Sequence, residues 1–316
     1  VAGVANISAG NETSLLDKLL KLGRTDVLDA FRSYVYYGTV SGSKDAGLSV
    51  SANTAIKSGQ NNQVTYSGTA GGFGGSLLNA SVKNSKVTEL SNVTGPNSVG
   101  GFIGYSGKSG VVDVNKLDVL GDNMGQLLGG ALGVLDVFGS HIDDSMVTGI
   151  DGGYTVQSTG GEEQIAGGFI GYGSGVQVST CDVSNLKHTT VTTPKNLEDT
   201  DGSSYFNTKQ SAYAVTGARY AGGYIGYMDI GSAASVGKGL SVLGTAIGIN
   251  DVLDALNVVV STVEHSNVTG NAGGFAVIAS TKNTESDASA DDVLGDAGGF
   301  AGSAVMIGIK RGLFSN

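Results

Sequence analysis

Short stretches of alternating apolar and polar residues recur along the chain. Val176–Ser179 (Val-Gln-Val-Ser) carries valine at every second position, and Ser85–Thr88 (Ser-Lys-Val-Thr) places the β-branched Val87 between polar residues. A period of two is typical of strands that bury one face. The stretches are bounded by Gly, Asn and Ser, which favour turns. The pattern predicts many short strands.

Longer apolar regions follow a different period. Between Lys116 and Phe138, apolar residues recur at steps of three and four, which indicates a helix. Its glycines weaken that helix by up to about 1 kcal/mol each relative to alanine. Similar regions span Leu240–Val260 and Ser14–Phe31, and Asp26–Phe31 is nearly copied at Asp251–Leu256. The first helical face would comprise Leu117, Leu120, Met124, Leu127, Leu128 and Leu132.

A small residue followed by Gly-Gly and an aromatic residue occurs six times. Successive Gly-Gly pairs are 29, 67, 55, 51 and 25 residues apart. The shortest spacings indicate a unit of 25 to 29 residues that holds two or three strands, with insertions in the longer ones. The copies are Ala70–Phe73, Val99–Phe102, Ala166–Phe169, Ala221–Tyr224, Ala272–Phe275 and Ala297–Phe300.

Such a unit predicts one coil of a β-solenoid. Glycine is required where the chain needs positive φ or where another backbone passes close by. The aromatic residue of each coil is expected to stack on its counterpart in the next. The alternative, an antiparallel Greek-key sandwich, would place Asn-Gly or Asp-Gly hairpin turns in register with the repeat. Asp151-Gly152 and Asp201-Gly202 occur, but neither is in that register.

The sequence therefore predicts an all-β solenoid, a right-handed parallel β-helix with inserted α-helical segments. Residues 1–38 are expected to form an N-terminal helical cap region. Residues 39–316 are expected to form the β-helix repeats, with helical insertions at about 116–138 and 238–262. The insertions either pack on the flank of the solenoid or form a groove for a partner, because large exposed apolar patches mark interaction sites.

Composition narrows the class of protein. Glycine accounts for 53 of 316 residues, but two prolines are too few for collagen. A hydrophobic content of 40% is too high for a disordered linker. The net charge of −10 argues against nucleic-acid binding. Polar residues such as Asn250 and Asp254 interrupt the most apolar window, so no membrane-spanning helix is expected.

The run from Ala166 to Val176, followed by Ser179–Val183, resembles the glycine-rich GLUG repeat of large surface proteins of Gram-positive bacteria. The resemblance covers roughly residues 70 to 310 and departs from the pattern in the long insertions. It implies an extracellular location at the bacterial cell surface, with cell-wall anchoring through a parent protein. It also implies a β-helical fold and an adhesive or scaffolding role. It supplies no catalytic residue.

Candidate catalytic groups are sparse. His141, His188 and His265 lack the spacing of a zinc site, and His141 and His265 are expected at equivalent turns or strand edges. The lone Cys181 follows alternating valines, so it is expected in the core as a small hydrophobe. No metal or cofactor is predicted. The acidic pairs that a glycan-active enzyme could use are Asp143 with Asp144, Asp199 with Asp201, and Asp291 with Asp292, all expected in solvated loops.

Tyr34, Tyr36 and Tyr37 form an aromatic cluster outside the repeat. Alternation places Tyr34 and Tyr36 on one face of a strand and Tyr37 on the other. This strand either provides a sugar-stacking platform or covers the first coil of the solenoid.

These features predict a non-enzymatic adhesin or stalk segment of a bacterial cell-surface protein. Its partners are expected to be an unidentified host or environmental glycan or protein ligand, and neighbouring repeats of a longer parent chain. Ligand contact is expected in the insertions, because loops on a rigid scaffold often carry function. Two alternatives are a glycan-active β-helical lyase or hydrolase and a self-assembling surface fibre that pairs through exposed strand edges.

Overall fold

The computed structural model describes the chain in several stretches, all of them built from strands and turns. These are residues 4–5, 33–52, 68–107, 139–159, 164–188, 213–229, 261–279, 295–305, 308–310 and 313–315. Every pairing between named strands in these stretches is parallel, and each strand pairs with strands from neighbouring repeats of the sequence. The described part of the chain is therefore all-β, as the alternating pattern predicts.

The strands form four sheets, which we name A to D. Sheet A contains β1 (Val4–Ala5), β6 (Gly74–Leu78), β10 (Ile103–Gly107), β15 (Ile170–Ser174), β20 (Ile225–Asp229) and β25 (Ala301–Ala304), in that spatial order. Sheet B contains β2 (Ser33–Tyr36), β7 (Ala80–Lys83), β11 (Ser140–Asp143), β16 (Val176–Ser179), β21 (Thr262–Glu264) and β26 (Gly308–Lys310).

Sheet C is the largest and sheet D the smallest. Sheet C has ten strands, β23 (Val277–Ala279), β18 (Val215–Gly217), β13 (Thr155–Ser158), β8 (Lys86–Gly95), β12 (Met146–Gly149), β17 (Asp182–Leu186), β22 (Asn267–Gly270) and β27 (Leu313–Ser315), with β3 (Thr39–Ser41) and β4 (Leu48–Ser51) also paired to β8. Sheet D contains β24 (Asp296–Gly298), β19 (Tyr220–Gly222), β14 (Ile165–Gly167), β9 (Ser98–Gly100) and β5 (Ala70–Gly71).

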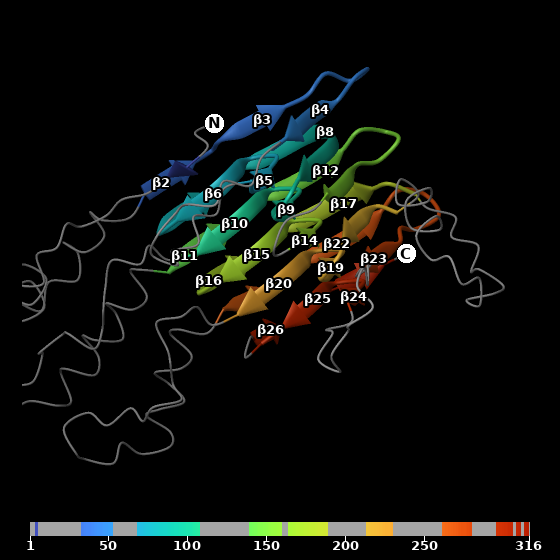
Figure 1. The fold of residues 1–316 in the computed structure, drawn as a ribbon. Coiled ribbons are helices and arrows are strands. Elements are labelled where there is room, and N and C mark those ends of the chain that lie inside the picture. Colours follow the sequence, from blue (N-terminus) through green and yellow to red (C-terminus); the bar gives the residue numbers. More distant parts are fainter. Residues whose placement is uncertain are drawn as a thin grey trace, which may run out of the picture.

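The chain visits the sheets in the constant order A, B, C, D and then begins again. We number these passages repeat 1 (β1–β5), repeat 2 (β6–β9), repeat 3 (β10–β14), repeat 4 (β15–β19), repeat 5 (β20–β24) and repeat 6 (β25–β27). Figure 1 shows the colours passing from blue to red across the molecule, because each repeat lies beside the preceding one.

The predicted right-handed parallel β-helix with inserted α-helical segments is wrong. The described residues contain parallel strands and no helix, and the strands belong to four sheets, of which sheet C curls like half of a barrel. The pairing of the long strand β8 is one difference from a simple coil. The first half of β8 pairs with β3 and β12, and its second half pairs with β4 and β13. Alternation predicts strands, but the assignment of strands to sheets depends on packing between distant residues.

The predicted helical regions lie largely outside the described residues. This applies to most of residues 1–38, to the whole insertion at 116–138 and to most of 238–262. Where the structure describes these ranges, it shows strands or their connections. Ser33–Tyr36 is strand β2, and Thr262 begins β21.

Inward-facing residues of successive repeats form columns in the core. One column in sheet C aligns Val87, Val147, Val183 and Val268, and all four are at most 1% exposed. Another in sheet B comprises Val82, Ile142, Val178 and Val263, which are fully buried. Burying each such side chain contributes about 1.5–3 kcal/mol. The columns keep the repeats in register, since a shift of one residue would expose the apolar face.

The aromatic residues of five motif copies stack in one column, as predicted. Neighbouring ring centroids are 4.6 to 5.0 Å apart and the rings are nearly parallel. The column comprises Phe73, Phe102, Phe169, Tyr224 and Phe300. Tyr224 keeps its hydroxyl satisfied by donating to the Cys181 carbonyl at 3.1 Å. Burial raises the pKa of this tyrosine.

The sixth copy, Ala272–Phe275, lies elsewhere. It falls between β22 and β23, both in sheet C, whereas the other five lead from sheet D to sheet A. The 25-residue unit expected from this copy is therefore wrong, because Gly274 and Gly299 are not equivalent positions. Repeat 2, with β6 to β9 between Gly74 and Gly100, is the repeat whose residues are all described and carries no long connection.

Candidate functional site

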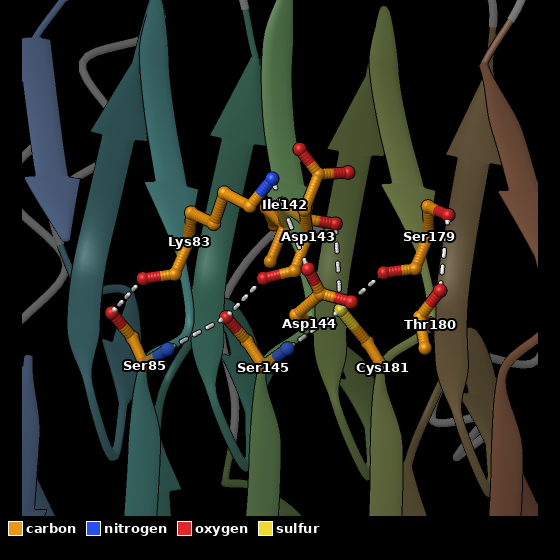
Figure 2. A network of polar contacts seen from close by, with 9 residues as sticks. All are labelled: Lys83, Ser85, Ile142, Asp143, Asp144, Ser145, Ser179, Thr180 and Cys181. Carbon is orange, nitrogen blue, oxygen red and sulfur yellow. Dashed lines mark hydrogen bonds and ion pairs between the residues drawn. The ribbon is translucent and has the colours of Figure 1, made fainter. Parts of the chain in front are cut away.

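The turn between sheets B and C contains a polar network that crosses several repeats (Figure 2). Ser85 donates to the Lys83 carbonyl at 3.1 Å and accepts the Gly38 amide at 3.1 Å. Ser145 repeats the arrangement one repeat later: it donates to the Asp143 carbonyl and accepts the Ser85 amide. Each side chain thus closes its own turn and binds the neighbouring one, which indicates a structural role for this ladder.

Cys181 occupies the next position of this ladder. Its thiol lies 3.2 Å from the Ser179 carbonyl, and the Ser145 amide donates to its sulfur at 3.4 Å. The Cys181 amide in turn donates to Ser266 Oγ at 3.2 Å. Cys181 is fully buried, and burial strongly raises the pKa of its thiol. The prediction of a core cysteine is confirmed, and the thiol substitutes for a serine hydroxyl.

The residue before each ladder position has a left-handed backbone. The φ angles lie between 47° and 58° at Tyr37, Asn84, Asp144, Thr180 and His265. Asn and Asp tolerate this region, whereas a β-branched residue such as Thr180 is strained there. Because the same conformation occurs in five repeats, the turn geometry belongs to the fold and is not confined to one site.

Asp143 and Asp144 occupy this turn. Asp143 ends β11, and Asp144 forms an ion pair with Lys83 at 3.9 Å, in which both side chains are nearly half exposed. This places Asp144 in solvent, as expected of a loop carboxylate. The other acidic candidates, Asp199, Asp201, Asp291 and Asp292, lie outside the described residues.

The histidines do not converge. His141 lies within β11 opposite Gln177, whereas His265 occupies the left-handed turn position equivalent to Asp144. Their expected equivalence is wrong, since the strand register places Thr262 opposite Gln177, in the row that contains His141. Within the described stretches, no group of three or more His, Cys, Asp or Glu side chains could hold a metal ion.

The connection between sheets A and B takes two forms. In repeats 2 and 4 it is a single residue with positive φ, Asn79 or Gly175. In repeats 1, 3 and 5 the corresponding connections include residues 6–32, 108–138 and 230–260, which lie outside the described residues. Three long connecting segments therefore start at the same position of the repeat, between sheet A and sheet B, whereas another, residues 189–212, follows β17 in sheet C.

A serine hydroxyl closes the base of two of these connections. Ser140 Oγ donates to the Gly107 carbonyl at 2.7 Å, so the residues on either side of segment 108–138 are joined. Ser261 Oγ donates in the same way to the Asp229 carbonyl across segment 230–260. Ser140 and Ser261 also accept the amides of Ala80 and Val176 in the uninterrupted repeats. Each of these two serine hydroxyls therefore joins the ends of a long connection in its own repeat and also binds a neighbouring repeat that has a one-residue connection.

A tyrosine cluster lies on repeats 3 to 5. Tyr172 contacts Tyr105 and Tyr227 edge to face, with centroids 5.2 Å apart in each pair. Tyr227 stacks on Tyr220 at 4.8 Å, and the Tyr172 hydroxyl donates to Asp229 at 3.0 Å. Partial burial raises the pKa of Tyr227, and the nearby Asp229 raises it further. These mutual contacts indicate that the cluster mainly stabilises the stacking of sheet A.

Tyr34 and Tyr36 differ from this cluster because they are exposed, at 45% and 53%. They point from the same face of β2, as predicted, and their ring centroids are 5.7 Å apart. Tyr37 follows at the turn and is 76% exposed. The exposure of the three tyrosines is compatible with the predicted sugar-stacking platform. The other predicted role, covering the end of the stacked repeats, is compatible with Val35 of β2, which packs against the core.

Neither the serine ladder nor the serine-closed bases were predicted from the sequence. A signal for the ladder exists: Ser85, Ser145, Cys181 and Ser266 each stand two residues before a valine of the buried column in sheet C. The serines at the bases, Ser140 and Ser261, carry no comparable local signal, because their partners precede insertions of about thirty residues.

Comparisons with known proteins identify no relative: no family model, no curated protein and no solved structure matches the chain. The resemblance to GLUG repeats therefore stays a prediction. Among the described residues, no helix has the length and hydropathy needed to cross a membrane.

Proposed function

We propose that this chain is a non-enzymatic scaffold segment of a bacterial cell-surface protein, which presents inserted segments for adhesion. The observation that carries the proposal is the common origin of residues 6–32, 108–138 and 230–260 at the connection from sheet A to sheet B. Parallel strands lie about 4.8 Å apart, so segments that arise in alternate repeats start at intervals of about 10 Å along one edge.

The scaffold itself is built for rigidity. Its stacked aromatic column and buried valine columns join repeats 2 to 5 continuously. The hydroxyls of the turn ladder are engaged in hydrogen bonds with backbone groups, so they are poorly placed to act as nucleophiles. The ion pair of Asp144 with Lys83 is nearly half exposed, whereas the carboxyl group of a general acid is usually buried. These features favour a scaffold that presents binding segments over a catalytic site.

The uninterrupted repeats supply a design for the test. Deleting residues 108–138 leaves Gly139 between Gly107 and Ser140, which reproduces the single-residue connection of Gly175. Replacing 230–260 by one glycine between Asp229 and Ser261 does the same in repeat 5. Because each new connection copies one already present in the fold, the shortened proteins are expected to keep the β-sheet circular-dichroism spectrum.

The full chain and the shortened proteins are then screened against host-matrix proteins, mucins and a glycan array. We expect saturable binding by the full chain that one or both deletions abolish. A matched control replaces 108–138 by a scrambled sequence of the same composition. The role of the inserted segments would be overturned if every ligand of the full chain still bound after both deletions, or if the scrambled control retained all binding. A chain that binds nothing on the screen would overturn the adhesive part of the proposal.

A further inference from the structure

The outward face of sheet B carries a strip of side chains that the proposed function does not use. The strip begins at Tyr34 and Tyr36, the exposed tyrosines of edge strand β2. The intervening Val35 packs against the core, so the two rings are fixed on the outer face by the strand itself. The rings are tilted by 56° and present their faces at different angles to a ligand.

The strand register extends the strip across four strands. Tyr34 lies opposite Ser81, followed by His141 and Gln177, and Tyr36 lies opposite Lys83, followed by Asp143 and Ser179. Ser81 is buried, at 9% exposure, whereas the other seven side chains are partly or largely exposed. We call these eight residues the sheet B strip. Figure 2 shows Lys83, Asp143 and Ser179 side by side on successive strands. With strands about 4.8 Å apart, the strip is roughly 14 Å long.

The chemistry of the strip restricts its ligand. It combines two aromatic rings with hydroxyl, imidazole, amide, ammonium and carboxylate groups, and none of its eight side chains is aliphatic. An apolar partner would desolvate the charged groups of Lys83 and Asp143, which is unfavourable. A polyanion would need clustered cations, but Lys83 lies beside Asp143 and pairs with Asp144. The complementary ligand is uncharged and rich in hydroxyls and has flat apolar faces.

We propose that the sheet B strip binds a neutral, unbranched glycan that lies across the strands. One sugar stacks on Tyr34 and Tyr36, whose amphipathic rings offer an apolar face and a polar edge. The following sugars exchange hydrogen bonds with Lys83, Asp143 and their neighbours. The site belongs to the scaffold and contains no residue of the inserted segments, so it is independent of the proposed role of those segments.

The test uses the full chain with cello-, manno- and chitohexaose as probes, measured by isothermal titration calorimetry. The double variant Tyr34→Ala/Tyr36→Ala is expected to weaken binding about tenfold or more, because it removes both rings. The matched control is Tyr37→Asn, which removes the adjacent exposed tyrosine at a position where φ is 58° and Asn is tolerated. This control is expected to retain wild-type affinity and stability.

A second measurement does not depend on variants. Saturating hexasaccharide should protect Tyr34 and Tyr36 of the wild-type protein from nitration and leave Tyr37 reactive, as mapped by mass spectrometry. The proposal is overturned if none of the three probes binds, if both tyrosines remain reactive in the presence of a bound probe, or if Tyr37→Asn weakens binding as much as the double variant. Preferential binding of acidic polysaccharides would overturn it as well.

Discussion

Residues 166–169 and 272–275 have the same sequence, Ala-Gly-Gly-Phe, but different structures. At 166–169 both glycines have φ outside the positive region, and the chain passes from β14 of sheet D to β15 of sheet A. At 272–275 both glycines have positive φ, 102° at Gly273 and 88° at Gly274, and the segment forms a turn within sheet C.

The two copies need glycine for different reasons. A Cβ on Gly168 would overlap the carbonyl oxygen of Gly223 in the next repeat, so the requirement there is close approach of two backbones. At Gly273 the backbone conformation itself excludes most L-residues, and a Cβ would also meet the ring of His188. The comparison shows that one short motif can serve two roles, and that its surroundings select between them.

The loss of unfolding free energy is expected to differ most between the variants Gly168→Ala and Gly273→Ala. The first forces apart two hydrogen-bonded repeats and should cost about 3 kcal/mol or more, because neither backbone can move alone. The second imposes an unfavourable φ on an exposed turn and should cost about 1–2 kcal/mol. Urea unfolding followed by circular dichroism measures both. Equal losses would show that the two copies are constrained alike.

The aromatic residues should differ in the same direction. Phe169 is fully buried between Phe102 and Tyr224, so Phe169→Ala should cost about 3–5 kcal/mol. Phe275 is partly buried at the margin of the core, and Phe275→Ala should cost about half as much. Thermal and urea unfolding of the two variants gives the comparison. A larger loss at Phe275 would contradict the assignment of the aromatic column.

A smaller change tests the turn of the second copy alone. Asn271 Oδ1 accepts the Ala272 amide at 2.7 Å, and its side-chain amide donates to the Asp151 carbonyl. Asn271→Ala removes both hydrogen bonds and should cost about 1 kcal/mol. Amide hydrogen exchange should increase at residues 270–275 and stay unchanged at residues 166–169. Faster exchange at both copies would show that the two regions unfold together.

Of the variants considered, Cys181→Ser is expected to change the free energy of unfolding least. Serine occupies the equivalent ladder positions, Ser145 and Ser266, so the variant should change the free energy of unfolding by less than about 0.5 kcal/mol. In the wild-type protein, the raised pKa and burial of the thiol should prevent reaction with a disulfide reagent at pH 8 until urea unfolds the chain. Rapid reaction of the folded protein would show that the ladder opens.

The outer face of sheet B could be predicted in part. Alternation correctly placed Tyr34 and Tyr36 on one face of a strand, because side-chain direction follows from residue parity. It could not place Ser81, His141 and Gln177 in the same row as Tyr34, since these residues are 47 to 143 positions away in the sequence. Residues so far apart in the sequence are aligned by the packing of the buried columns, which sets the register between neighbouring strands.

The sequence next to the sixth motif copy, Ala272–Phe275, differs from that of the other copies. Val-Thr-Gly precedes three copies, and three residues separate it from Val99 and from Ala221, but one residue separates it from Ala272. The three-residue linkers include the first residue of a sheet D strand, Ser98 or Tyr220, and the one-residue linker leaves no room for that strand. The distance between motifs was therefore more informative than the motif itself.

The sequence by itself determined the strands, their alternating faces and the stacking of the aromatic residues in five of the six motif copies, because these depend on local parity and on a motif repeated in register. The tertiary structure decided which sheet each strand joins, which glycines need positive φ and which connection receives the long insertions. Those features depend on atoms that are distant in the sequence: the Gly168 backbone closely approaches Gly223 of the next repeat, and the Ser140 hydroxyl binds the Gly107 carbonyl across an insertion. The amino-acid sequence does not give the spatial distance between residues that are far apart along the chain.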